Sequence, residues 1–283
     1  MASEEAVGLE ELLKQAHGLP PDKQRKVASI LGSVVADAAA QPLHWVYNPD
    51  ALKSAVAGID CPEFLPKSAN PFYCIPTGSQ SPYGDQLINM LESLVVSKGF
   101  NADDFGEKVF KAFGPGSPYD NPVTADYAKG KQDKRYPIQS KWVTFMLSRF
   151  TKLYSEKKKL EDETEEDTND DPDSIARCVP LVALYTGNPE MLSTAYDACS
   201  MIQSSDIILT IVLAACRVME QYILQDGTEA DGSPQVEKVI GDLKSAKRTF
   251  PNDLDLAVSG FLADALATKE MTVDEATAKL GKA

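Results

Sequence analysis

The chain contains 283 residues with a mass of 30.7 kDa, which is enough for one large domain or two of ordinary size. Apolar residues account for 43% of it and charged residues for 25%, so a sizeable core is expected and global disorder is not. The formal net charge of −14 argues against a basic surface that binds nucleic acid or an anionic membrane. Nine acids lie between residues 161 and 173, so one segment carries most of the excess negative charge.

The cysteines and the apolar runs predict a cytoplasmic chain without a membrane span. The five cysteines form no CxxC pair, which argues against a disulfide scaffold. Cys178, Cys199 and Cys216 stand among apolar residues, so they are expected to be buried, reduced thiols. The first 13 residues hold four glutamates and no basic stretch, unlike a signal peptide. The longest apolar run, 207–216, is far shorter than the ~20 residues that a membrane span requires.

Helix patterns dominate the N-terminal half of the chain. Apolar residues at helical spacing predict three helices, which begin near residues 9, 20 and 85. A fourth is predicted at Asn101, an N-cap candidate that is followed by the acids Asp103 and Asp104. The first is expected to end at Gly18, and the second to run through the small residues 36–40 and stop near Pro42. Seven prolines between residues 42 and 82 predict a long loop without a helix, because each proline removes a backbone donor and crowds the preceding turn. A loop of this length inside a compact domain is often functional.

Two loops flank the next predicted helix. The first is rich in proline and glycine and covers residues 114–137. The helix that follows presents an apolar face made of Trp142, Phe145, Met146, Phe150 and Leu153. The second loop, 155–173, contains the acidic segment and is expected to be solvated and flexible. Two other interpretations stay open: a metal cluster of Asp170, Asp171 and Asp173, or Asp171 as a helix N-cap before Pro172.

From residue 173 onward one helix follows another. The expected helices are 175–185, one from Pro189, one from Ser204 or Ser205, 234–249, 253–267 and one from Thr272. Glu275 is placed to complete a capping box with Thr272. The sequence shows no alternating strand pattern and no repeat of 20–50 residues. We therefore predict a single all-α domain over residues 1–283, with two long proline-rich loops.

Four residues draw attention as candidates for chemistry, because the usual nucleotide, metalloprotease and serine-hydrolase motifs are absent from the sequence. His17 ends a helix, which favours a capping or surface role, whereas His44 either packs on aromatic residues or lines a pocket. Asp37 stands among apolar and small residues, where a bare carboxylate is costly. It either binds backbone or a buried arginine, or it lines a cleft. Asp85 is either a helix N-cap or a partner of Asp37 in that cleft.

Three segments resemble one known family. Residues 32–45, GSVVADAAAQPLHW, resemble the opening helix of the ADP-ribosylglycohydrolase superfamily. Residues 83–86, YGDQ, fall where that family has its Thr-Asp-Asp-Thr metal motif, and residues 173–190 look like its middle helix. The run 70–78 is similar to the J1-crystallin branch, the jellyfish lens proteins, with the related selenoprotein J group. The resemblance covers about residues 25–280.

The resemblance implies an all-α orthogonal multi-helix bundle of the ADP-ribosylglycohydrolase type. Active members bind two Mg²⁺ ions in a cleft and cleave an N- or O-glycosidic bond to ADP-ribose. On this pattern Asp85 is the one carboxylate left in the metal motif, a vestigial metal ligand, and one carboxylate does not hold two Mg²⁺ ions. Asp37 matches the aspartate of the first helix, and His44 falls where a glutamate is usual. Asp37, His44 and Tyr83 are then the substrate-cleft candidates.

The resemblance also implies departures in the C-terminal half. The family's Gly-Asn-Gly falls on residues 171–173, and Arg177 matches an arginine that is expected to be structural. Active members carry a second acidic motif near the C-terminus, and nothing before Ala283 matches it. A shortened C-terminus is therefore expected.

Three functions remain open at this point. The first is a catalytically degenerate protein with a structural, crystallin-like role, no catalytic residue and no cofactor; the net charge of −14 would favour its solubility. The second is a Mg²⁺-dependent hydrolase that cleaves a glycosidic bond to ADP-ribose, with Asp85 on the metal, Asp37 in support and His44 or Tyr83 on the substrate. The third is a module that binds an ADP-ribose-like small molecule without turnover. None of the three involves nucleic acid or a membrane.

Overall fold

The computed structural model describes residues 9–120, 137–142, 145–160, 171–225 and 232–281. Within these ranges the chain is helical, with no strand and one isolated bridge between Tyr73 and Ile138. The α-helices are α1 (Leu9–His17), α2 (Pro21–Ala40), α3 (Pro49–Ala55), α4 (Pro82–Ser97), α5 (Ala102–Phe113), α7 (Phe145–Ser155), α8 (Ser174–Tyr185), α9 (Met191–Ser200), α10 (Asp206–Leu224), α11 (Ser233–Lys244), α12 (Asp255–Leu266) and α13 (Val273–Leu280). A short 3₁₀ helix, Gln41–Leu43, continues α2. The predicted all-α class is therefore confirmed.

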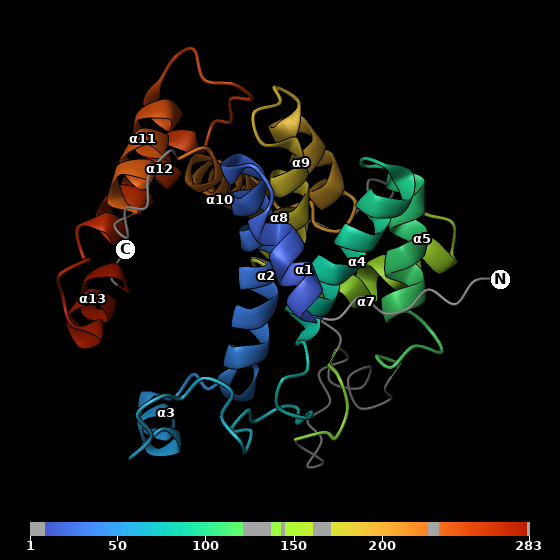
Figure 1. The fold of residues 1–283 in the computed structure, drawn as a ribbon, viewed down its shortest axis with the longest axis vertical. Helices are drawn as coiled ribbons and strands as arrows, with labels where there is room; N and C mark the ends of the chain where they lie inside the picture. Colours follow the sequence, from blue (N-terminus) through green and yellow to red (C-terminus); the bar gives the residue numbers. More distant parts are fainter. Residues whose placement is uncertain (1–8, 121–136, 143–144, 161–170, 226–231, 282–283) are drawn as a thin grey trace.

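The helix α8 lies at the centre of the fold (Figure 1). Its sequence is almost continuously apolar, and a helix of this kind is buried on all sides. It packs against α2, α4, α9 and α10, and eight of its 12 residues are buried. On one side of this core α11, α12 and α13 follow α10, and on the other side α5 and α7 follow α4 (Figure 1). The segments that carry the family resemblance, in α2, α4 and α8, are therefore direct neighbours.

The proline-rich region between residues 42 and 82 contains a helix, so the prediction of a loop without one was wrong. α3 begins at Pro49, and the Asn48 side chain accepts hydrogen bonds from the two backbone N–H groups that follow Pro49, at 2.9 and 3.1 Å. Proline is favourable at the first helical position because the N–H it lacks would have no partner inside the helix. No further proline occurs before Pro62, which leaves room for α3.

Several other helix boundaries differ from the predictions. Trp142 lies in the segment before α7 rather than on its face. Asp173, not Asp171, occupies the N-cap position of α8. α9 begins at Met191, because Pro189 belongs to the turn that precedes it. The predicted helix 234–249 also ends earlier, at Lys244. The shifts at Asp173 and Met191, of two residues each, are within the usual uncertainty of helix ends, whereas those at Trp142 and Lys244 are larger.

Two predicted caps are confirmed. The side chain of Asn101 accepts a hydrogen bond from the backbone N–H of Asp104 at 2.9 Å, which satisfies a free donor at the start of α5. Thr272 and Glu275 form the complete capping box at the start of α13.

Parts of the two remaining loops lie outside the described residues. These parts are 121–136 in the second proline-rich loop and 161–170 in the acidic loop. The proposed cluster of Asp170, Asp171 and Asp173 is therefore described only at its last two members.

The helix α10 follows Ser205, as predicted from its start at Ser204 or Ser205, and it is longer than the apolar run 207–216 that argued against a membrane span. It has 19 residues and a mean hydropathy of 1.8, enough by length and composition for a membrane span, and half of that stretch is buried inside the protein. Ile208, Leu209 and Val212 belong to the main core. The core helix of a globular fold passes the same test, so this result gives only weak support for a membrane span.

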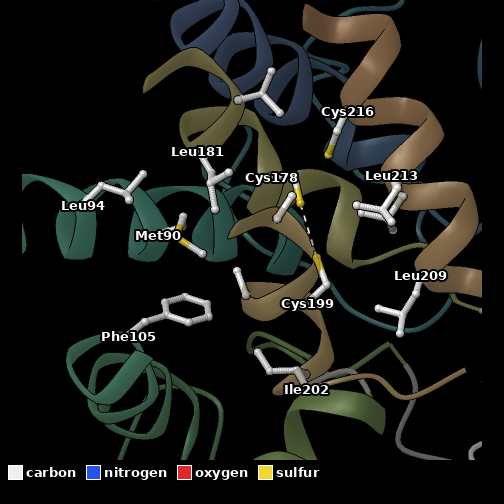
Figure 2. Close-up of a cluster of buried hydrophobic side chains, with 14 of the residues drawn as sticks. Met90, Leu94, Phe105, Cys178, Leu181, Cys199, Ile202, Leu209, Leu213 and Cys216 are labelled. Atoms are coloured by element: carbon white, nitrogen blue, oxygen red, sulfur yellow. Dashed lines mark hydrogen bonds between the residues drawn. The ribbon is translucent and has the colours of Figure 1, made fainter. Parts of the chain in front are cut away.

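Three thiols meet in the main core (Figure 2). Cys178 of α8, Cys199 of α9 and Cys216 of α10 are free and at most 1% exposed, which confirms the prediction of buried, reduced thiols. The Sγ atoms of Cys178 and Cys199 lie 3.3 Å apart, and Figure 2 shows them facing each other between Leu181 and Leu209. The contact with Cys178, together with burial, raises the pKa of the Cys199 thiol well above its usual value. The thiolate, which is the reactive form, is therefore disfavoured in the core.

This burial predicts how many thiols react in the folded protein. Cys61 is exposed and Cys74 is partly buried, so a thiol reagent is expected to modify these two first. The other three should react only at the rate of unfolding, and immediately in denaturant. The measurement is a count of modified thiols against time, and a Cys61→Ser variant should lose one fast equivalent. Rapid modification of all five thiols in the native protein would contradict the described core.

Candidate functional site

The candidate site lies at the N-terminal end of α4. Ser81 is the N-cap of this helix, and its hydroxyl accepts a hydrogen bond from the backbone N–H of Tyr83 at 3.1 Å. α4 therefore begins at Pro82, and Asp85 lies inside its first turns rather than at the N-cap that was one of its two interpretations. Asp37 in α2 and His44, just after α2, face the same end of α4 through the contacts described next.

Asp37 holds this end of α4 in place. Its Oδ2 accepts the backbone N–H of Ser81 at 2.7 Å, and its Oδ1 accepts the Ser81 hydroxyl at 2.5 Å. These are the backbone contacts expected of a structural carboxylate, with Ser81 rather than a buried arginine as the partner. Gly84 makes the approach possible, because a Cβ at this position would lie 2.3 Å from Asp37 Oδ2 and 2.1 Å from Gln80 Oε1.

His44 and Tyr83 belong to a cluster of aromatic rings. The ring centroids of these two residues lie 5.7 Å apart, and the hydroxyl of Tyr73 lies 3.4 Å from His44 Nδ1. Tyr83 also accepts a hydrogen bond from the indole N–H of Trp45 at 2.9 Å. Burial, followed by the negative charge of Asp173, raises the pKa of Tyr83, so its phenol stays protonated at neutral pH. His44 is thus packed on aromatic residues within the candidate site.

The environment of His44 predicts a pH effect on stability. Burial lowers the pKa of His44 below its ordinary value of 6.5, and the nearby Asp37 only partly offsets this. The unfolded chain therefore binds a proton more readily than the folded one, so stability from this group is complete above pH 6.5 and is lost as the pH falls below it. Urea unfolding between pH 7 and pH 5 should show a smaller loss in His44→Gln than in the native protein. His17 is exposed and provides the control: His17→Gln should follow the native curve, and an unchanged curve for His44→Gln would contradict the prediction.

Asp85 is already paired within the chain. Its Oδ2 accepts a hydrogen bond from the hydroxyl of Tyr119 at 2.6 Å and forms an ion pair with the ammonium of Lys141. Burial and the charge of Asp85 raise the pKa of Tyr119, so its hydroxyl remains a donor. Lys141 carried no signal in the sequence analysis, because a single lysine in a loop resembles any solvated surface charge.

A buried polar network lies beside the site, where α4 meets α8. The guanidinium of Arg177, only 1% exposed, donates to Gln86 and Ser174, and to Gln203 Oε1 at 3.3 Å. The amide of Gln86 donates to Asp173 Oδ2 at 3.4 Å. The expected structural role of Arg177 agrees with these contacts. The sequence analysis missed Gln203; the signal for the network as a whole was an arginine within an otherwise apolar helix.

The arrangement brings together most of the predicted site residues but does not fit a pair of Mg²⁺ ions. Both carboxylate oxygens of Asp37 accept hydrogen bonds from Ser81, and Asp85 is engaged by a lysine. Among the residues that the structure describes, no three His, Cys, Asp or Glu side chains are grouped so that they could hold a metal ion. A divalent ion of this kind needs several free oxygen ligands. The described side chains at this site therefore do not provide the ligands that such a metal pair requires.

Comparison with known proteins identifies the family. The family model for ADP-ribosylglycohydrolase matches residues 19–282. Crystallin J1B of Tripedalia cystophora is 32% identical over 232 residues, which cover 82% of this chain and 65% of the crystallin. Crystallin J1A of the same organism is 32% identical over 203 residues, which cover 71% of this chain and 59% of the crystallin. The chain thus spans about two thirds or less of these relatives. It belongs to the ADP-ribosylglycohydrolase family, and its relatives include the J1 crystallins.

Proposed function

We propose that this chain is a catalytically degenerate member of the ADP-ribosylglycohydrolase family with a structural, crystallin-like role in the cytoplasm. The observation that carries the proposal is the state of Asp85. It is the one carboxylate at the position of the family's metal motif, and it is bound to Lys141 and Tyr119. A carboxylate held in this way is a poor ligand for a catalytic metal ion.

Two further observations support this proposal. Where the family has its other aspartate beside Asp85, this chain has Gly84, and the space next to Gly84 is taken by the carboxylate of Asp37. Gln86, which replaces the last threonine of the motif, is committed to Arg177 in the buried network. The crystallin names of the two relatives and the net charge of −14 agree with a protein that stays soluble at high concentration.

The test is an assay for release of ADP-ribose. The full chain is incubated with peptides ADP-ribosylated on serine or arginine, with Mg²⁺ and with a chelator, beside a family member that retains the complete Thr-Asp-Asp-Thr motif. We expect no release above the protein-free blank under either condition. Mg²⁺-dependent release that disappears in Asp85→Asn would overturn the proposal and support the hydrolase instead. Calorimetric binding of ADP-ribose without release would support the binding module.

A further inference from the structure

We infer that the ammonium of Lys141 is the built-in cation of this site and takes the place of a divalent metal ion opposite Asp85. The proposed function concerns the absence of turnover, whereas this inference concerns how the charge of Asp85 is balanced. It would hold even if a metal-independent activity were found.

The first step is that the carboxylate of Asp85 needs a positively charged partner. Its side chain is only 23% exposed, and the hydroxyl of the buried Tyr119 donates to it at 2.6 Å. A carboxylate withdrawn from water to this extent is costly unless a cation or several donors compensate it. Lys141, whose side chain is 27% exposed, supplies that charge directly on Oδ2. The resemblance implies that a metal ion compensates the negative charge at this position in the active members of the family.

The second step is that the backbone fixes Lys141 in position. It lies in residues 137–142, and this segment is held at Ile138, whose carbonyl accepts from the N–H of Cys74 at 2.8 Å and whose N–H donates to the carbonyl of Phe72 at 2.9 Å. At its other end Trp142 is 7% exposed and meets the ring of Trp45 edge-on, with centroids 5.9 Å apart. The lysine therefore has anchored residues on both sides. The main chain that carries Lys141 is thus held in place, and only its side chain has to be ordered when the ion pair forms.

The third step is that a metal ion on Asp85 would compete with the ammonium of Lys141. The ammonium of Lys141 lies 5.7 Å from the centroid of the Tyr119 ring, so the same tyrosine contacts the cation with its ring and the carboxylate with its hydroxyl. A metal ion on Asp85 would have to displace this ammonium or lie beside it, and two cations at such a distance repel each other. The salt bridge between Lys141 and Asp85 thus takes the place of a metal site.

The experiment compares melting temperatures of the full chain and its variants. The native protein should show no heat on titration with MgCl₂ and the same Tm with Mg²⁺ or with a chelator. Lys141→Met should lower the Tm, because Asp85 is left without compensation, and adding Asp85→Asn should recover part of that loss. Lys108 provides a control at similar exposure (24% and 25%), since its partner Asp104 keeps other compensation: the Ser93 hydroxyl and the positive end of α5, in whose first turn it lies. Lys108→Met should change the Tm less than Lys141→Met.

Two outcomes would overturn the inference. One is a rise in Tm of the native protein with Mg²⁺ that is absent in Asp85→Asn. The other is a double variant that melts no higher than Lys141→Met, because the lysine would then act by packing and not by charge. A positive result for metal-independent release of ADP-ribose would, in contrast, overturn only the proposed function.

A second measurement keeps the test valid if Lys141→Met does not fold. Acetylation of lysines, followed by mass spectrometry, should be several-fold slower at Lys141 in the native protein than in Asp85→Asn. Lys108, which pairs with Asp104, is the internal reference, and its rate should be the same in both proteins. Equal rates at Lys141 in the native protein and in Asp85→Asn would refute the role of the ion pair.

Discussion

Replacing Arg177 by methionine is expected to lower the free energy of unfolding by about 3–5 kcal/mol, as is typical when one partner of a buried ionic network is removed. Arg177 is 1% exposed and Asp173 is 2% exposed, so water does not compensate the charge of either side chain. Without the guanidinium, Gln86 and Gln203 each lose a donor that no water can readily replace. Equilibrium unfolding in urea measures the change.

Two variants show whether the network itself is responsible. Arg25 of α2 is partly buried and donates to the carbonyl of Ile223 at 2.5 Å, outside the network. Arg25→Met should cost only about 1 kcal/mol, the usual value for one hydrogen bond. Arg177→Lys keeps the charge but not the planar fork, so it should still destabilise the fold. A loss in Arg177→Met no larger than that in Arg25→Met would show that the network contributes little.

Helix positions could be predicted from the sequence because they depend on local patterns. Apolar spacing predicted the helices around Val27, Leu94 and Leu213, and cap chemistry predicted the starts at Asn101 and Thr272. The helix α3 was not predicted because every proline between residues 42 and 82 was taken to prevent a helix, whatever its position. Its first residue is a proline, and at that position a proline favours a helix.

The site was harder to predict because its decisive contacts join residues far apart in the chain. Asp37 and Asp85 could be singled out as isolated acids, but their partners could not. Lys141 lies 56 residues after Asp85, and Gln203 lies 26 residues after Arg177. No local pattern distinguishes such a lysine or glutamine from a solvated one, so tertiary packing alone reveals which charges are already balanced.

Gly84→Ala is the prediction that tests most directly how closely Asp37 packs against α4. In the middle of a helix, alanine is normally more stable than glycine by about 0.5–1 kcal/mol, since glycine loses more backbone freedom on folding. At Gly84 we expect the opposite sign, a loss of about 1–3 kcal/mol, as for other overpacked positions. The added Cβ would lie 2.3 Å from Asp37 Oδ2 and 2.1 Å from Gln80 Oε1. Neither side chain is free to move, because Asp37 holds Ser81 and the Gln80 amide donates to the carbonyl of Val34 at 3.1 Å.

The chain offers matched controls for this sign change. Gly260 in α12 and Gly241 in α11 have nothing within 4 Å of the position that a Cβ would occupy, so alanine there should stabilise the protein by the normal helix increment. Combining Gly84→Ala with Asp37→Ala should cost less than the sum of the two single losses, because the clash and its partner are removed together. Urea unfolding of the five variants decides the matter. If Gly84→Ala stabilised the protein as Gly260→Ala does, Asp37 would not occupy the space beside α4. A carboxylate at residue 84 could then be accommodated at this site, as it is in the family's metal motif.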